Sequence, residues 1–389
     1  MTARQKLHET APRTDWTHPA IGRLAAPHQI ATAAEDEVVS VTAEADQILA
    51  RVDGTVGFVT LNRPKAINSL THTMVTALSE VLRAWAHDAG ITAVVLNGAG
   101  DRGLCAGGDV VAIYHSARDD GSAARQFWFD EYQLNAFIAR YPKPYVSLMD
   151  GIVMGGGVGI AAHGNARIVT DTSRIGMPEV GIGFIPDVGA TYLLSRAPGL
   201  TGLHACLTGA PFSGSDAIAL GFADYYVPKE RLAAFNAAVV ADGVDAALRT
   251  HTVEPPPSEL TQQHWIDECY DRPTIADIVA ALRSHDAEAA NAAADLIVSR
   301  SPIALVVTLQ AVRSAAKLNT LEDVLVQEYR TSCASLNSHD LVEGIRAQLI
   351  DKDRNPKWSP DSVTAVTPEG IDAYFKPLEF DLTLPNTSS

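Results

Sequence analysis

Two carboxylates, Glu179 and Asp187, lie in a short segment that holds no basic residue to pair with them. The segment spans residues 176–189, and its other members are glycine, proline and apolar residues. A carboxyl group in apolar surroundings loses hydration, and the resulting rise in its pKa suits it to proton transfer near neutral pH. Each acid also follows a proline, which restricts the backbone and helps to fix the direction of the side chain. The pattern indicates a pair of catalytic acids; the alternative is a loop with two exposed carboxylates.

Two glycine-rich segments could supply backbone donors to a reacting oxygen. One is Cys-Ala-Gly-Gly-Asp at 105–109, and the other is Gly-Gly-Gly at 155–157, which precedes a predicted helix. The first turn of a helix leaves its backbone N–H groups unpaired, and glycine lets a substrate approach them closely. Two such donors can form an oxyanion hole, in which each is worth about 10²–10³ in rate. The alternative interpretation is that both segments are tight turns.

Other common catalytic motifs are missing from the sequence. It contains no G-x-S-x-G, no H-E-x-x-H and no G-x-x-x-x-G-K motif, and its 12 histidines are scattered. The residues Gly157, Gly159 and Ala162 fit the dinucleotide pattern G-x-G-x-x-A, but an acid at the expected spacing is absent. We therefore expect no metal and no separate cofactor. What remains is acid–base or nucleophilic chemistry by carboxylates, with backbone stabilisation of an oxyanion.

Composition and charge narrow the class of partner. The chain has 389 residues, of which 47% are hydrophobic, and 30 basic against 46 acidic residues give a net charge of −16. This balance argues against nucleic acid and against an anionic membrane surface as the main partner. No apolar run reaches transmembrane length. The four cysteines form no C-x-x-C pair and are interpreted as reduced thiols, so we expect a cytoplasmic protein.

The elements that must position these residues alternate between strand and helix. This alternation predicts an α/β core over residues 37–235, followed by a helical region over 236–383 and a tail at 384–389. Residues 1–36 are predicted to be a disordered extension. An organelle presequence, which would place the protein in a matrix compartment, is the alternative, although Glu9 and Asp15 count against it. The predicted strands are 38–41, 50–61 with a turn at 53–54, 93–96, 145–149 and 168–170, and the main predicted helices are 69–89, 127–140, 275–282, 287–298, 303–317, 321–335 and 341–350.

Several motifs, taken together, resemble a known superfamily. Asn-Arg-Pro-Lys-Ala-Ile-Asn-Ser-Leu at 62–70, the 105–109 segment and the glycines at 155–159 resemble the crotonase, or enoyl-CoA hydratase/isomerase, superfamily. The segments 177–179, 185–189 and 340–358 are more closely similar to its branch that hydrolyses 3-hydroxyisobutyryl-CoA. The resemblance covers roughly residues 50–360. It implies a crotonase-like spiral of ββα turns with a helical C-terminal region, an acyl-CoA substrate and a place in valine catabolism. The oligomeric state stays open, a homo-oligomer included.

The same resemblance assigns the backbone donors and the nucleotide end of the substrate. It implies that the N–H groups of Gly108 and Gly156 hold the thioester carbonyl oxygen. It also implies that Lys65 and Ala66, together with Ala106, hold the adenine end of CoA.

The acids distinguish two reactions within the superfamily. The resemblance implies that Glu131, Glu179 and Asp187 line the substrate pocket, although Glu131 by itself would be interpreted as a solvated helix acid. Enoyl-CoA hydratases use two glutamates, of which one matches Glu179 and the other would stand at Gly159. The extra acid, Asp187, stands where hydratases commonly have glycine. The pattern favours thioester hydrolysis over hydration or isomerisation, and over a non-catalytic acyl-CoA-binding protein.

Overall fold

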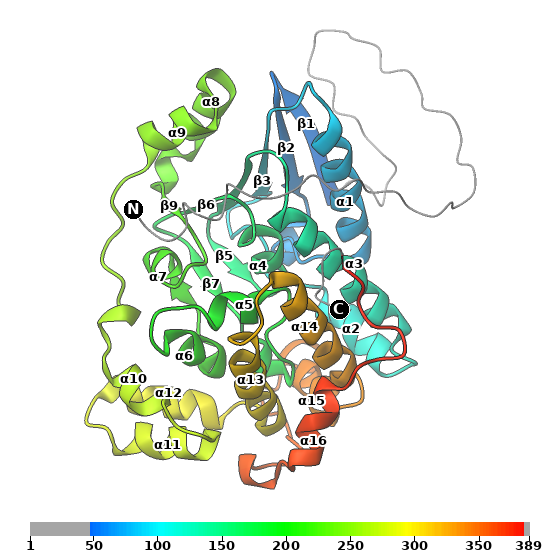
Figure 1. The fold of residues 1–389 in the computed structure, drawn as a ribbon, viewed down its shortest axis with the longest axis vertical. Helices are drawn as coiled ribbons and strands as arrows, with labels where there is room; N and C mark the ends of the chain where they lie inside the picture. The colour runs from blue at the N-terminus through cyan, green and yellow to red at the C-terminus, as the bar shows by residue number, and fades with distance from the viewer. Residues whose placement is uncertain (1–46, 385–389) are drawn as a thin grey trace. The chain divides into compact units, whose positions relative to one another are not determined.

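The computed structural model describes residues 47–384 (Figure 1). The predicted strand at 38–41, the predicted extension at 1–36 and all but the first residue of the predicted tail lie outside this range. Within it, no single helix is long and apolar enough to cross a membrane, and only the bent pair α12–α13 passes that test jointly.

Two sheets form the framework of the α/β part. In the larger sheet, the first pair of strands is antiparallel and each later neighbour is parallel, in the order β1-β2-β3-β4-β6-β9. The strands are β1 (Ile48–Asp53), β2 (Val56–Leu61), β3 (Ala93–Gly98), β4 (Tyr145–Met149), β6 (Ala166–Val169) and β9 (Tyr225–Tyr226). The smaller sheet, in the order β5-β7-β8, contains β5 (Ile152–Met154), β7 (Arg174–Gly176) and β8 (Phe212–Ser213).

Burial explains why these segments form strands. All five residues of β4 and the first four of β3 are buried, as expected for parallel strands that are covered on both faces. Strand β4 occupies the predicted residues 145–149. The turn between β1 and β2 requires Gly54, whose φ of +59° lies in the left-handed region.

Helices surround the sheets and make up the remainder of the chain after β9. Those of the α/β part are α1 (His72–His87), α2 (Val110–Ala117), α3 (Ser122–Ala139), α4 (Gly156–Ala161), α5 (Ala190–Leu194), α6 (Thr201–Thr208) and α7 (Gly214–Ala219). Those of the C-terminal region are α8 (Leu232–Asp242), α9 (Val244–His251), α10 (Trp265–Tyr270), α11 (Ile275–Ser284), α12 (Glu288–Val298), α13 (Pro302–Ala315), α14 (Leu321–Ser335), α15 (His339–Ile345) and α16 (Pro368–Asp372).

The predicted fold class, α/β with a helical C-terminal region, is confirmed. One predicted helix differs: residues 341–350 form the end of α15 and then a π-helical turn, η7 (Arg346–Ile350). Helix α2 and the short strands of the smaller sheet were not predicted, because segments of two to eight residues carry too little periodicity to be recognised.

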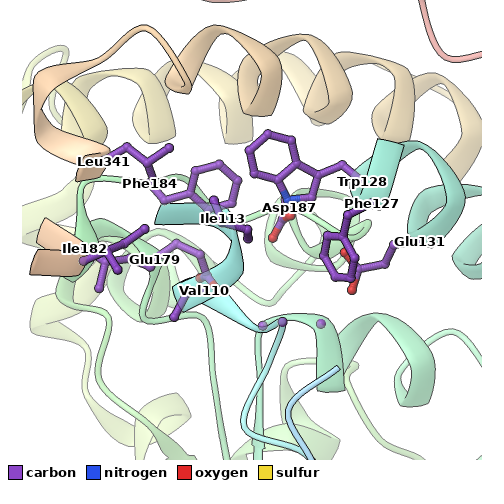
Figure 2. A pocket seen from close by; sticks show the side chains of 14 residues that line it. Val110, Ile113, Phe127, Trp128, Glu131, Glu179, Ile182, Phe184, Asp187 and Leu341 are labelled. Atoms are coloured by element: carbon purple, nitrogen blue, oxygen red, sulfur yellow. The ribbon is translucent and has the colours of Figure 1, made fainter. Parts of the chain in front are cut away.

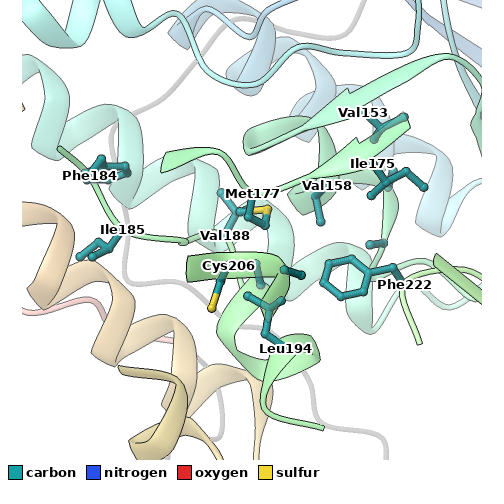
Figure 3. Close-up of a cluster of buried hydrophobic side chains, with 14 of the residues drawn as sticks. Val153, Val158, Ile175, Met177, Phe184, Ile185, Val188, Leu194, Cys206 and Phe222 are labelled. Carbon is teal, nitrogen blue, oxygen red and sulfur yellow. The ribbon is translucent and has the colours of Figure 1, made fainter. Parts of the chain in front are cut away.

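The C-terminal helices pack directly on the α/β part. Helix α14 lies against α3, and α15 lies against α2 and the short 3₁₀ helix η4 (Glu179–Ile182) (Figure 1). One continuous hydrophobic core joins side chains of both parts. Figure 3 shows a section of it, where Val188 and Met177 lie among buried neighbours such as Leu194, Cys206 and Phe222. The residues of the site described below are therefore held by a continuous hydrophobic core.

Candidate active site

A small cavity of about 40 Å³ brings together the acids and glycines that the sequence singled out. Figure 2 shows it between α3, the loop after β5, η4 and α15. Its lining consists of Gly108, Val110, Ile113, Phe127, Trp128, Glu131, Gly155, Gly156, Glu179, Ile182, Phe184, Asp187, Leu341 and Ile345. All three predicted acids and both predicted backbone donors are among these residues.

The two glycine segments lie side by side because isolated β-bridges tie them together. Cys105 pairs with Val153, donating its N–H to the Ile152 carbonyl at 3.1 Å and accepting from the Met154 N–H at 2.9 Å. A second bridge, between Leu70 and Gly108, holds the other side of the 105–109 loop. The loop after β3 and the segment after β5 are thus fixed next to each other.

The backbone donors are close together, and one of them, Gly156, needs to be glycine. A Cβ at Gly156 would lie 3.2 Å from the Gly108 nitrogen and 2.5 Å from Oε1 of Glu131. Gly156 is the first residue of α4, so its N–H belongs to the unpaired first turn of that helix. Within residues 47–384, neither the Gly108 nor the Gly156 N–H donates to another backbone group. The arrangement can hold an oxygen that develops negative charge.

The three acids are buried without a basic partner in the described part of the chain. Glu131, Glu179 and Asp187 are 2%, 6% and 4% exposed, and no ion pair joins them to lysine, arginine or histidine. The Oε1 atom of Glu131 and the Oε2 atom of Glu179 have no hydrogen-bond partner there. Glu131 is therefore a pocket residue, and the interpretation of it as a solvated helix acid is wrong.

Burial separates the acids by their ease of ionisation. It raises the pKa of Glu131 and of Glu179 well above the ordinary value, and the nearby Asp187 raises both further. Burial also raises the pKa of Asp187, to about 7, but there the hydroxyl of Tyr132 donates to Oδ2 at 2.6 Å and opposes the rise. Asp187 is the acid most favoured to carry the charge near neutral pH.

Side chains of helix α14 form hydrogen bonds to Tyr132 and to the residues that follow Asp187. The hydroxyl of Tyr132 also lies 2.7 Å from Oγ of Ser332. Glu328, one turn earlier on α14, accepts hydrogen bonds from the Gly189 N–H at 2.5 Å, the Thr191 N–H at 2.9 Å and the Thr191 hydroxyl at 2.6 Å. None of Tyr132, Ser332 and Glu328 was predicted. The available signal was the i, i+4 spacing of Glu328 and Ser332, which follow Leu321 and Leu325 on the same helix face.

An apolar wall closes the cavity opposite the backbone donors. The rings of Trp128 and Phe184 stack with centroids 5.3 Å apart and an interplanar angle of 11° (Figure 2). Leu341 and Ile345 complete the wall from α15.

Two glycines allow α15 to lie close to η4. A Cβ at Gly183 would lie 2.0 Å from the Asp340 carbonyl oxygen, and a Cβ at Gly344 would lie 2.3 Å from the Ile182 carbonyl carbon. Asp340 is itself fully buried, and its carboxylate accepts from the Ser301 hydroxyl at 2.6 Å. The backbone of α15 therefore touches the segment that carries Glu179.

Comparison with known proteins identifies the family. The enoyl-CoA hydratase/isomerase family model matches residues 56–375. The chain belongs to this family. The crotonase-like fold that the sequence motifs predicted is thereby confirmed.

Curated relatives and solved structures carry different names within this family. A 3-hydroxyisobutyryl-CoA hydrolase of Danio rerio is 36% identical over 87% of this chain and 92% of its own length, and a probable 3-hydroxyisobutyryl-CoA hydrolase of Arabidopsis thaliana is 36% identical over 87% and 93%. A solved carnitinyl-CoA dehydratase from Mycobacterium thermoresistibile is 66% identical, covers 88% of this chain and all of its own, and has a TM-score of 0.85. A solved enoyl-CoA hydratase from Rhodobacter sphaeroides is 39% identical, covers 87% of this chain and all of its own, and has a TM-score of 0.83.

The position that would carry a hydratase's second glutamate has no room for one. A Cβ at Gly159 would lie 2.6 Å from Cβ of Val188 and 2.9 Å from Nδ2 of Asn135. Both neighbours are buried, and Val188 is held in the turn after Asp187. A glutamate at this position would force the packing apart.

The residues predicted to hold the adenine end of CoA lie together, but outside the lining of the cavity. Lys65 and Ala66 belong to the 3₁₀ helix η3 (Pro64–Ala66), and Lys65 is exposed. The Ala106 N–H donates to the carbonyl of Ile67 at 2.9 Å, and this bond joins the end of η3 to the 105–109 loop. Their contact with CoA stays a prediction. Within the described residues, no group of three or more histidine, cysteine, aspartate or glutamate side chains could hold a metal ion.

Proposed function

We propose that this chain hydrolyses the thioester bond of short β-hydroxyacyl-CoA substrates, converting 3-hydroxyisobutyryl-CoA to 3-hydroxyisobutyrate and CoA. The observation that carries the proposal is the convergence of Glu131, Glu179 and Asp187 on one cavity, beside two N–H groups that donate to no other backbone group within residues 47–384. The crowded, acid-free position at Gly159 weighs against a two-glutamate hydratase. The hydrolase names of the curated animal and plant relatives support the same reaction.

The substrate carbonyl oxygen is bound by the N–H groups of Gly108 and Gly156, which stabilise the negative charge of the tetrahedral intermediate. In its ionised form Glu179 removes a proton from the attacking water, or its carboxylate adds to the carbonyl carbon and water then cleaves the anhydride; burial raises the pKa of Glu179, which makes this ionised form a stronger base. In both routes the carbon–sulfur bond breaks, the sulfur takes a proton and CoA leaves. Glu179 qualifies because it lines the cavity and its Oε2 has no hydrogen-bond partner among the described residues.

The other two acids act on the acyl group. Asp187, ionised and held by Tyr132, accepts a hydrogen bond from the β-hydroxyl of the substrate. Glu131 lies beside Gly156 and keeps its proton, because burial and Asp187 raise its pKa. A neutral Glu131 can donate a hydrogen bond to the substrate and does not repel the oxyanion.

The apolar wall leaves a small cavity, which favours a substrate with a short acyl group. The stacked rings of Trp128 and Phe184 and the side chain of Leu341 leave a cavity of only about 40 Å³. An acyl chain of four carbons fits the scale of this space better than a long one. The proposed substrate places the reaction in valine catabolism, without a metal or separate cofactor. We keep the cytoplasm as the proposed compartment, and a matrix compartment as the alternative that the mitochondrial names of vertebrate relatives favour.

Release of free thiol tests the proposal. The full chain is mixed with 3-hydroxyisobutyryl-CoA, 3-hydroxypropionyl-CoA, butyryl-CoA and acetyl-CoA in the presence of EDTA, and CoA is detected with a thiol reagent. We expect the two β-hydroxyacyl substrates to be cleaved fastest. The proposed function would be overturned if no thioester released CoA, or if EDTA abolished the release.

A second candidate is reversible hydration of an enoyl-CoA. The specific observation in its favour is the 66% identity with a solved carnitinyl-CoA dehydratase. The loss of enoyl absorbance with crotonyl-CoA measures this reaction directly, and we expect it to be far slower than thioester cleavage. Hydration faster than cleavage on every substrate would make the hydratase assignment the better one, and tight binding of CoA thioesters with neither reaction would indicate a binding protein.

A further inference from the structure

We propose that α14 is a positioning element for Asp187, in which Ser332 acts through Tyr132 on the carboxylate and Glu328 holds the turn that follows it. The inference rests on the proposed function, because it assumes that Asp187 contacts the substrate. It adds positioning residues from a helix about 140 positions further along the chain.

The first arm acts on the side chain. The Tyr132 hydroxyl has a single hydrogen, and it donates this hydrogen to Asp187, because an ionised carboxylate has no proton of its own to donate. The 2.7 Å contact between Tyr132 and Ser332 is then a bond that Ser332 donates. This chain of donors ends on Oδ2 of Asp187 at 2.6 Å, and all three side chains are at most 4% exposed. It fixes the rotation of the carboxylate and favours its charged form.

The second arm acts on the backbone. Val188 has a φ of +55°, a left-handed conformation that is strained for a β-branched residue. Such a conformation persists only when its surroundings hold it. Glu328 holds the next residues by accepting from the N–H groups of Gly189 and Thr191 and from the Thr191 hydroxyl.

A histidine holds the other side of the same turn. The Nε2 atom of His163 lies 2.7 Å from the Val188 carbonyl oxygen. Burial lowers the pKa of His163 to about 4, so the ring is neutral near pH 7 and donates from Nε2 to that carbonyl. The strained turn that aims Asp187 is therefore tied to two elements outside it.

The acidic groups around Asp187 oppose its ionisation. The titratable groups that face it are Glu131 and Tyr132 on α3, Glu179 on η4 and Glu328 on α14. Four carboxyl groups without a basic partner in the described part of the chain cannot all ionise near neutral pH. The hydrogen bond from Tyr132 favours the ionised form of Asp187. An amide in place of Glu328 would turn an NH₂ group towards at least one of its N–H donors.

The test compares Tyr132→Phe and Ser332→Ala with matched controls in the full chain. Tyr141→Phe removes a buried hydroxyl that donates to the Leu82 carbonyl at 3.0 Å, and Ser335→Ala removes one that donates within α14 at 2.9 Å. Loss of the Tyr132 donor should move the limb of the pH–rate profile that reports Asp187 upward by about one pH unit. Ser332→Ala should move it in the same direction by less, and both controls should leave it in place.

Glu328→Gln tests the second arm and should lower kcat by about 10²-fold, since a misplacement of about 1 Å can cost that much, with KM little changed. A kcat within threefold of wild type in a folded Glu328→Gln variant would overturn the second arm. If this variant does not fold, Glu328→Asp serves in its place and should show a smaller loss of kcat.

A readout independent of turnover separates this inference from the proposed function. The infrared carboxylate titration of Asp187 is isolated as the difference between each protein and its Asp187→Asn partner. Tyr132→Phe should raise the midpoint of this titration whether or not any thioester is cleaved. An unchanged midpoint, or equal midpoints in Tyr132→Phe and Tyr141→Phe, would overturn the first arm even in an active hydrolase. Absence of hydrolysis with a raised midpoint would overturn the proposed function alone.

Discussion

The α/β core and the C-terminal helices contribute to one cavity in different ways. The core supplies the groups that we propose act on the substrate: the N–H groups of Gly108 and Gly156, and the acids Glu131, Glu179 and Asp187, all of which line the cavity. The C-terminal region supplies an apolar wall through α15 and hydrogen bonds behind Asp187 through α14. The difference teaches that the chemistry resides in short core motifs, whereas the shape of the site depends on contacts over long sequence separations.

The largest effect should come from the core acid. Glu179→Gln keeps the shape of the side chain but can neither accept a proton nor attack as a carboxylate. We expect thioester cleavage to fall by about 10²–10⁴ with substrate binding nearly unchanged. Steady-state cleavage and calorimetric binding of the substrate measure the two quantities. Turnover like that of wild type would remove Glu179 from the mechanism.

The backbone donors should come next. Gly156→Ala would place a Cβ 2.5 Å from Glu131 Oε1, and should cost about 10²–10³ in kcat through loss of the oxyanion site. Gly108→Ala is the matched control, because its Cβ would meet only the Phe127 ring at 3.4 Å, an ordinary contact. Equal losses in the two variants would contradict the close approach at Gly156.

The C-terminal wall should affect selectivity more than rate. Leu341→Ala enlarges the acyl end of the cavity, so the ratio of kcat/KM for hexanoyl-CoA to that for butyryl-CoA should rise about tenfold, at the lower end of what one methylene is worth. Leu325→Ala removes an equally buried leucine of α14 that does not line the cavity. The wall has no role in selectivity if both variants change the ratio equally.

The smallest effect concerns stability and pH. Burial raises the pKa of Glu131 in the folded state, so the folded protein binds more protons than the unfolded chain above the ordinary value of 4.5. The free energy of unfolding therefore falls as pH rises through this window, by at most about 1.4 kcal/mol per pH unit for one group. Denaturant unfolding from pH 4.5 to 8 should show a shallower fall in Glu131→Gln than in wild type. Parallel curves would show that Glu131 does not stay protonated.

The sequence predicted the parts of the site that local motifs encode. Glu179 and Asp187 stood out because prolines precede them and residues 176–189 contain no basic residue, and the glycine runs indicated backbone donors. The strand at 145–149 and the long C-terminal helices were recognisable from their periodicity. The place of Glu131 in the pocket followed from the family resemblance alone, because local sequence does not report its close approach to Gly156.

The unpredicted residues share a physical reason. Tyr132 reaches Asp187 and Ser332 over sequence separations of 55 and 200 residues, and Glu328 reaches Gly189 over 139. No local periodicity reports such pairings. The left-handed Val188 was equally hidden, because its conformation is imposed by His163 and Glu328 and contradicts its own preference.

The close approach of Gly183 to the Asp340 backbone also makes completion of the site depend on the order in which the chain is synthesised. Residues near 340 leave the ribosome long after the Glu179 segment, and domains generally fold as units while the chain emerges at about 5–20 residues per second. Until α15 arrives, the segment with Glu179 lacks the surface against which its backbone packs. The nascent protein can thus carry all three cavity acids and both backbone donors and still lack a complete cavity, because α15 is among the last helices to be made.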